Sequence, residues 1–409
     1  MKDLNLSLRS VFCLLGLLLV FVTGCAENNQ QPAKDAAAVQ ENEKQLEKAE
    51  GEAGTAEAAI KEATQELWKY ETQGRITSSP LVYENAVFFG SDDGKLHAVS
   101  AEGGEVKWSF EAGSEVRSSP KLTSSGNVIF QNHDGVVYAL DAKSGKAAWV
   151  FKEGAVQGQM EMDQWDYFDA SASVDGDRIY IGHASGMMYA LQEKSGEMLW
   201  QFKAGAPIKA TAAHDDERVY VGDWNGKLYA LNKTDGKLIW EYQTKPNQHH
   251  KAIQSTPWVE DGVVYVGGRN FSLYALDAAK GTVLWEQPEP AWVASPVLAE
   301  GKLLAGNSNG TFMKAVEPDT GSMLWKFMLK SNVLAAPAVA DGVVYFGSGY
   351  AYANGSREEF LYAVELATGV LKWKHPTYKL QTTPVVQGDI IYYTGFDQAL
   401  HAVRMGGTD

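Results

Sequence analysis

Cysteine is nearly absent from this chain of 409 residues. Its two cysteines, Cys13 and Cys25, both lie in the first 25 residues. If Cys13 is lost with a cleaved leader, the remaining chain has no cysteine pair, so a disulfide framework and chemistry that needs one are excluded. The sequence also lacks the Cys-x-x-Cys-His pattern that attaches c-type haem.

Excess positive charge is lacking too. The sequence has 36 Lys and Arg against 51 Asp and Glu, which gives a net charge of −15. Proteins that bind nucleic acid present a basic face that displaces counterions from the phosphates. We therefore expect no nucleic-acid partner.

Residues 1–24 are typical of a bacterial lipoprotein signal peptide. Lys2 and Arg9 give a basic start, and the apolar run Val11 to Phe21 is too short to span a bilayer comfortably. Small residues then precede Cys25, where we expect cleavage and attachment of a lipid anchor such as palmitate. An uncleaved membrane anchor is the alternative.

Residues 25–65 are predicted to form a lipidated acidic tether. The segment from 26 to 67 has no aromatic residue and contains 10 acidic residues against 4 lysines. Such a composition favours a solvated chain over a packed domain. The residue after Cys25 is Ala26 and not the Asp that often retains lipoproteins in the inner membrane, so we expect an outer-membrane protein that faces the periplasm.

One repeating unit makes up most of the remaining chain, as in the stretch VGDWNGKLYALNKTDGKLIW that ends at Trp240. A Trp recurs at intervals of 40 to 51 residues by subtraction of positions, always with Gly four residues and Ala ten residues before it. This period, with several short strands per repeat, is typical of a β-propeller. The glycine suits a tight turn, the alanine leaves room for a neighbouring blade, and the indole covers it. The Trp residues in this register, which we expect to pack between blades, are Trp108, Trp149, Trp200, Trp240, Trp285, Trp325 and Trp373.

The repeats predict an all-β fold, an eight-bladed propeller of four-stranded blades over residues 66–405, followed by a tail at 406–409. Trp68 resembles the closing Trp of a repeat, yet no strands precede it. The last repeat, from Thr383 to Ala402, provides three strands and no Trp. We expect the strand around Trp68 to complete this last blade and close the ring, which removes open sheet edges.

The pattern Ala-x-Asp-x-x-x-Gly-x-x-x-Trp, present at Ala139 to Trp149 and at Ala275 to Trp285, resembles the PQQ-like repeat of eight-bladed propellers. With the lipoprotein signal, the tether and the nearly minimal blades, the chain is most similar to the BamB lipoproteins. That resemblance implies a non-catalytic, monomeric scaffold that holds partners of the outer-membrane protein assembly machinery near the membrane.

Three insertions depart from the repeat, at residues 152–170, 244–254 and 347–360. If the four strands of a blade are lettered A to D, the loop from B to C and the crossover from D to the next blade's A emerge on the same face of the ring. All three insertions are expected on that face. Long loops on a rigid scaffold commonly bind partners, although loops that pack on themselves are the alternative. Trp224 and Trp292 lie outside the repeat register, and Trp224 is placed near the same face. The candidate binding residues are Trp165, Asp166, Tyr167 and Asp169 in the first insertion, His249, His250 and Lys251 in the second, Tyr350, Tyr352 and Arg357 in the third, and Arg269 at a B–C turn.

Two other functions stay open from the sequence. Quinoprotein dehydrogenases share the repeat, which would imply PQQ and calcium on the propeller axis, with Asp163, Asp166 and Asp169 as calcium ligands or base. A surface lipoprotein that binds glycans or another ligand through Trp165 and Tyr167 is the third hypothesis. Because adjacent histidines with no third ligand are weak evidence for a metal, we expect no metal site and no cofactor.

Overall fold

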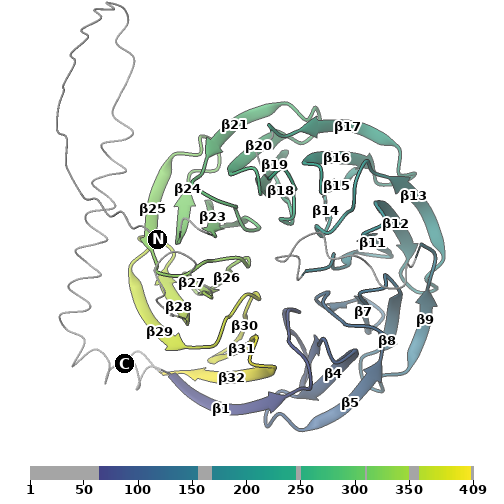
Figure 1. Ribbon diagram of the computed structural model, residues 1–409, viewed down its shortest axis with the longest axis vertical. Helices are drawn as coiled ribbons and strands as arrows, with labels where there is room; N and C mark the ends of the chain where they lie inside the picture. Colours follow the sequence, from purple (N-terminus) through teal and green to yellow (C-terminus); the bar gives the residue numbers. More distant parts are fainter. Residues whose placement is uncertain (1–63, 155–167, 246–249, 309–310, 350–358, 407–409) are drawn as a thin grey trace, which may run out of the picture.

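A computed structural model describes residues 64–154, 168–245, 250–308, 311–349 and 359–406. These residues form eight four-stranded antiparallel sheets, arranged as blades around a central axis (Figure 1). The prediction of an all-β, eight-bladed propeller is confirmed. Within the described ranges no helix is long and apolar enough to cross a membrane.

Each blade has four strands, lettered A to D from the axis outward. The A strands are β2 (Leu81–Tyr83), β6 (Lys121–Leu122), β10 (Ser173–Asp175), β14 (Ala213–His214), β18 (Trp258–Glu260), β22 (Val297–Ala299), β26 (Ala338–Ala340) and β30 (Val385–Gln387). The B strands are β3 (Ala86–Gly90), β7 (Asn127–Gln131), β11 (Arg178–Gly182), β15 (Arg218–Gly222), β19 (Val263–Gly268), β23 (Lys302–Asn307), β27 (Val343–Gly347) and β31 (Ile390–Thr394). The C strands are β4 (Lys95–Ser100), β8 (Val137–Asp141), β12 (Met187–Gln192), β16 (Lys227–Asn232), β20 (Ser272–Asp277), β24 (Phe312–Val316), β28 (Phe360–Glu365) and β32 (Ala399–Met405). The D strands are β5 (Val106–Glu111), β9 (Ala147–Phe151), β13 (Met198–Lys203), β17 (Leu238–Gln243), β21 (Val283–Pro288), β25 (Met323–Met328), β29 (Leu371–Pro376) and β1 (Thr64–Glu71).

The hydrophobic core lies between the blades and is built mainly from strands B and C. In β15 every residue after Arg218 is buried, and in β16 only the two end residues are partly exposed. Because both faces of these strands pack against neighbouring blades, their sequences are continuous apolar runs instead of alternating ones. In the D strand β17, Trp240 and Tyr242 are partly buried and the other four residues are exposed, as expected at the rim of the ring.

The recurring Trp, Gly and Ala meet at the contact between blades. In each C–D pair the Ala lies directly opposite the Trp, as Ala230 does opposite Trp240. Seven glycines at the C–D turns have φ between +68° and +76°, and a Cβ on any of them would lie 3.0 Å or less from the indole of the preceding blade. Seven indoles also donate a hydrogen bond to a carbonyl oxygen of the next blade's C–D turn, at 2.7 to 3.1 Å. Glycine is therefore required both by the backbone conformation and by the approach of the ring.

The ring is closed by the two ends of the described chain. Strand β1 pairs antiparallel with β32, from Thr64 opposite Met405 to Glu71 opposite Ala399 (Figure 1). This confirms the predicted closure, although the strand begins at Thr64, two residues before the expected boundary. Across the seam the His401 imidazole lies between Glu66 Oε1, at 2.8 Å, and Asp397 Oδ2, at 2.9 Å.

Candidate functional site

A cavity of about 1200 Å³ occupies the centre of the ring. Its wall consists of the D–A crossovers and the first residues of the A strands of all eight blades, with B–C turn residues from three of them, Arg269, Ser308 and Phe396. Both kinds of loop open on the same face because the strands of each blade are antiparallel. The cavity is thus the place where loops from distant parts of the chain meet.

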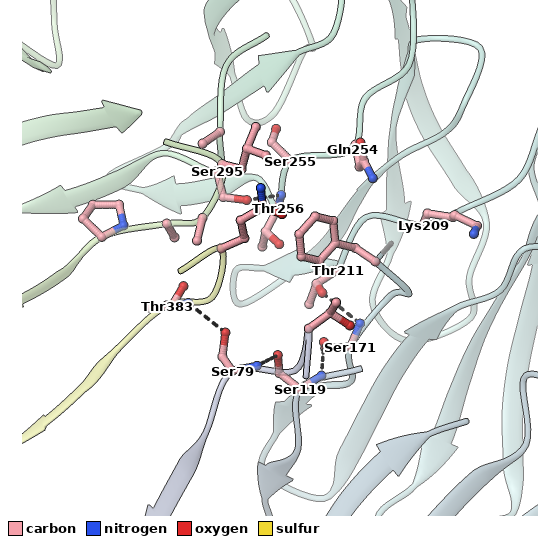
Figure 2. Close-up of a pocket in the computed structure, with 18 of the residues that line it drawn as sticks. Ser79, Ser119, Ser171, Lys209, Thr211, Gln254, Ser255, Thr256, Ser295 and Thr383 are labelled. Atoms are coloured by element: carbon pink, nitrogen blue, oxygen red, sulfur yellow. Dashed lines mark hydrogen bonds between the residues drawn. The ribbon is translucent and has the colours of Figure 1, made fainter. Parts of the chain in front are cut away.

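A ring of hydroxyl groups lines this cavity at the start of the A strands. The backbone N–H of Ser79 donates to Ser119 Oγ at 2.9 Å, and Ser119 N–H donates to Ser171 Oγ at 2.8 Å. The same bond joins Ser171 to Thr211, Thr256 to Ser295, and Thr383 of the last blade to Ser79 of the first (Figure 2). The hydroxyls of Ser79, Ser119, Ser171, Thr211 and Ser295 therefore each satisfy a backbone donor of the preceding blade. The sequence signal was available, because seven of the eight residues before the Pro or Ala that starts a repeat are Ser or Thr, with Ala336 as the exception.

Two carboxylates organise cationic side chains around the cavity. Asp92, in the B–C turn of the first blade, pairs with Arg75 at 3.0 Å and with Arg117 at 3.0 Å. These arginines come from the crossovers that precede the first and second blades, so the carboxylate connects neighbouring blades. Sequence reasoning did not single out either arginine, because nothing local distinguishes them from ordinary loop cations.

Asp169 forms the second such centre, and it lies at the end of the first insertion. Its Oδ2 is 2.9 Å from His133 Nδ1, and its Oδ1 is 3.6 Å from Lys209 Nζ. The hydrogen bond to Asp169 raises the pKa of His133 above its ordinary value. The Asp169 and Lys209 side chains are only 5% and 1% exposed, so this is a buried charge cluster.

An aromatic and cationic stack lies beside the cavity. The guanidinium of Arg269 is 3.9 Å from the ring centroid of Trp292 and 5.0 Å from that of Trp224. His250 meets Trp292 edge to face, at 5.2 Å between ring centroids, and lies 5.9 Å from Phe271. Because one guanidinium makes a cation–π contact with both indoles, it holds the two rings together. We call these five residues the Trp–Arg stack.

Local structure places Arg269 in the stack. The B–C turn after β19 has Phe271 at φ +68°, and the Asn270 amide donates to Tyr274 Oη at 2.6 Å and to the Lys245 carbonyl at 3.0 Å. Arg269 N–H donates to the Ala252 carbonyl, at 2.9 Å, in the preceding crossover. The turn is therefore held to the second insertion, which provides His250.

The sequence matches the family described as Outer membrane protein assembly factor BamB, over residues 52–164, 152–314 and 269–406. The chain belongs to this family. No curated protein matches the chain in sequence. Solved structures with the same fold include BamB from Moraxella catarrhalis, 17% identical, with a TM-score of 0.65, covering 84% of this chain and 100% of that one.

Two further structures show how widely this fold is used. The computationally designed Ika8 protein is 17% identical, with a TM-score of 0.67, and the match covers 83% of this chain and 100% of the Ika8 chain. The quinohemoprotein alcohol dehydrogenase ADHIIG from Pseudomonas putida HK5 is 14% identical, with a TM-score of 0.65, and the match covers 85% of this chain and 77% of the dehydrogenase chain. At these identities the likeness shows the fold alone.

The BamB-family fold brings the described ends of all three insertions to the cavity. Asp169 lines it at the end of the first, and His250 at the second. At the third, Gly349 N–H donates to the carbonyl of cavity residue Asn332, at 3.1 Å, and Glu359 Oε2 accepts from the N–H of Lys379, also 3.1 Å away.

Four predicted candidates can be placed in the structure. Arg269 and His250 belong to the Trp–Arg stack, Asp169 to a buried charge cluster, and Lys251 is exposed beside the stack. The other candidates lie outside the described residues: Cys25, Trp165, Asp166, Tyr167, His249, Tyr350, Tyr352 and Arg357.

The quinoprotein hypothesis requires a set of calcium ligands. No group of three His, Cys, Asp or Glu side chains that could hold a metal occurs in the described part of the chain. Asp169, proposed as a ligand in the quinoprotein hypothesis, already has its two oxygens next to His133 and Lys209. A carboxylate paired with cations does not fit a calcium site. Asp163 and Asp166 lie outside the described residues.

Proposed function

We propose that this protein is a non-catalytic, lipid-anchored scaffold that binds protein partners during the assembly of outer-membrane proteins. Membership of the BamB family supports the process, and the Trp–Arg stack supports the mode of binding. Tryptophan and arginine are the residues most enriched at the centres of protein interfaces. Here they sit on loops held by a rigid ring, so little conformational entropy is lost on binding.

The direction of β1 supports an orientation in which the cavity face of the ring points away from the membrane. Strand β1 starts at Thr64 and ends at Glu71, and the chain then reaches Arg75 at the cavity. The chain before Thr64 therefore joins the ring at the end of β1 that is remote from the cavity face. With a lipid on Cys25, the Trp–Arg stack would be directed away from the anchored side and toward partners in the periplasm.

Crosslinking in native outer membranes, followed by mass spectrometry, tests this proposal. The wild-type protein is expected to capture components of the outer-membrane assembly machinery, and Trp292→Ala is expected to reduce that capture at least tenfold, as truncation of a central interface residue does. Leu284→Ala is the matched control, because this apolar side chain is 53% exposed on the D strand β21, away from the stack. Capture of none of the machinery by the wild type, or equal capture by all three proteins, would contradict the proposal.

A quinoprotein oxidoreductase is the second candidate function. The fold shared with quinohemoprotein alcohol dehydrogenases and the cations at the cavity favour an acidic cofactor such as PQQ, whereas the pairing of Asp169 disfavours calcium. Titration of the purified protein with PQQ and calcium, with glycans as a parallel series, distinguishes these alternatives. Saturable PQQ binding with alcohol oxidation would establish the oxidoreductase. Saturable glycan binding would establish the surface lipoprotein that binds glycans.

A further inference from the structure

Strand β1 makes side-chain hydrogen bonds to histidines of three consecutive blades, the seventh, the eighth and the first. Three of the eight histidines in the sequence therefore meet at the one strand that closes the ring. Titratable groups are thus concentrated where the chain from the expected lipid anchor enters the ring. The pairs are Thr64 Oγ1 with His375 Nδ1 of β29 at 2.9 Å, Glu66 Oε1 with His401 Nδ1 of β32 at 2.8 Å, and Tyr70 Oη with His97 Nδ1 of β4 at 3.2 Å.

Carboxylates lie against both ring nitrogens of His401. Its Nδ1 faces Glu66, and its Nε2 lies 2.9 Å from Asp397 Oδ2 in the B–C turn of the same blade. A neutral imidazole has one N–H and can donate to only one of these carboxylates, whereas the imidazolium donates to both. The full set of hydrogen bonds across the seam therefore requires a positive charge on His401.

Lys69 of β1 and Tyr393 of β31 also face His401. Lys69 is opposite His401 in the ladder and lies 3.9 Å from Asp397 Oδ2, so it shares that carboxylate. Tyr393 stacks on the imidazole at 4.7 Å between ring centroids, and burial raises the pKa of this phenol, which stays neutral. Although burial lowers the pKa of His401, hydrogen bonds to Asp397 and Glu66 raise it more, so it lies above the ordinary value of about 6.5.

His375, on the other side of the seam, favours the opposite charge state. Its Nδ1 is hydrogen-bonded to Thr64, and its ring lies 6.2 Å from that of Tyr393 between centroids. Burial lowers the pKa of His375, while the charge of Glu66 raises it and the charge of His401 lowers it further. At neutral pH the uncharged imidazole therefore accepts the Thr64 hydroxyl. Acidification adds a second imidazolium to a seam that already holds that of His401.

We propose that β1 is a pH-sensitive clasp, which closes the ring near neutral pH and loosens when the medium becomes either more acidic or more alkaline. The contribution of His401 is complete below about pH 6.5 and is lost as the pH rises through its folded pKa. The contribution of His375 is present above about pH 6.5 and is lost as the pH falls through its folded pKa. Loosening of β1 uncovers the edge of β32, whose unpaired N–H and C=O groups form a template for another strand. The clasp operates whichever partner the cavity face binds.

Hydrogen exchange followed by mass spectrometry measures the clasp directly. The full-length protein in detergent is exchanged between about pH 5 and about pH 9, and the protection of β1, corrected for the intrinsic exchange rate, is divided by that of β17. Strand β17 has the same place in an ordinary blade, so the ratio removes changes common to the whole ring. We expect the ratio to be highest near neutral pH and to fall about threefold to tenfold on each side, as the loss of one partly exposed charged contact does.

Two variants separate the acid and alkaline changes, and each is the matched control of the other. His401→Gln cannot carry the charge, so the alkaline fall is expected to disappear while the acid fall remains. His375→Gln is expected to remove the acid fall and to leave the alkaline one. Glu66→Gln keeps both histidines but removes one carboxylate, so its alkaline fall should begin at lower pH. His214→Gln, in β14 of the fourth blade, removes a histidine far from the seam and should alter neither change.

Three results would overturn the clasp. They are a ratio that does not vary with pH, an alkaline fall that persists in His401→Gln, and an equal loss of protection in β1 and β17, which would mean that the whole ring unfolds. If loss of near-ultraviolet circular dichroism shows that His401→Gln does not fold, Glu66→Gln decides, because the Glu66 side chain is 49% exposed and its replacement leaves the core intact. An alkaline fall at the same pH in Glu66→Gln as in the wild type would then overturn the proposal.

Discussion

The contact between Trp200 and Gly236 gives the sharpest test of how the blades are held together. Gly236 has φ +71°, and a Cβ there would lie 2.5 Å from the indole of Trp200 in the preceding blade. Gly262, in the A–B turn of the next blade, has a similar φ of +76°, but a Cβ there would meet nothing within 4 Å. The two glycines therefore share the backbone requirement and differ in the packing requirement.

Alanine at each position separates these two contributions to the free energy of unfolding. Gly262→Ala is expected to cost about 1 kcal/mol, which is the strain of a left-handed backbone on a residue with a Cβ. Gly236→Ala has the same strain and must also displace the indole, which adds about 1 to 3 kcal/mol by analogy with overpacked cores. We therefore expect a total loss of about 2 to 4 kcal/mol for Gly236→Ala.

Urea unfolding followed by far-ultraviolet circular dichroism measures both variants without relying on the Trp fluorescence that the change perturbs. A double-mutant cycle provides the control, because in a Trp200→Leu background the indole is gone and Gly236→Ala should cost no more than Gly262→Ala. Equal losses for the two glycine variants in the wild-type background would refute the argument that the indole contact requires glycine.

Three further predictions concern the seam and the hydroxyl ring. Although burial lowers the pKa of His401, its hydrogen bonds to two carboxylates raise the pKa more, so it lies above its ordinary value. Its stabilisation is complete below the unfolded pKa of about 6.5 and is lost as pH rises through the folded pKa, so the difference in unfolding free energy between wild type and His401→Gln should shrink above neutral pH; a constant difference would contradict this. Ser119→Ala removes the acceptor of a backbone N–H and should cost about 1 kcal/mol in urea unfolding, while Ala336→Ser, which adds the hydroxyl missing from the ring, should not destabilise. Trp68→Ala should speed hydrogen exchange in β1 more than in β16, because its indole joins the closing strand to the Ala101 carbonyl; uniform exchange would argue against a seam held by this contact.

The sequence determined the ring almost completely. The spacing of Gly236 and Trp240, repeated with Ala230, reflects contacts that every blade must make with the next, so a local pattern carries tertiary information. The incomplete repeats around Trp68 and after Thr383 likewise required each other. These features are predictable because the repeat fixes which parts of the chain become neighbours.

Only the tertiary structure determined which side chains line the cavity. Arg269 contacts both Trp224 and Trp292, and Lys121 lines one recess with Arg75, yet no local pattern distinguishes these side chains from those of other loops. Their proximity depends on blades that are distant in sequence and meet only at the axis. The sequence therefore predicted which face carries the loops, while closure of the ring gathered the charges and indoles that give this face its chemistry.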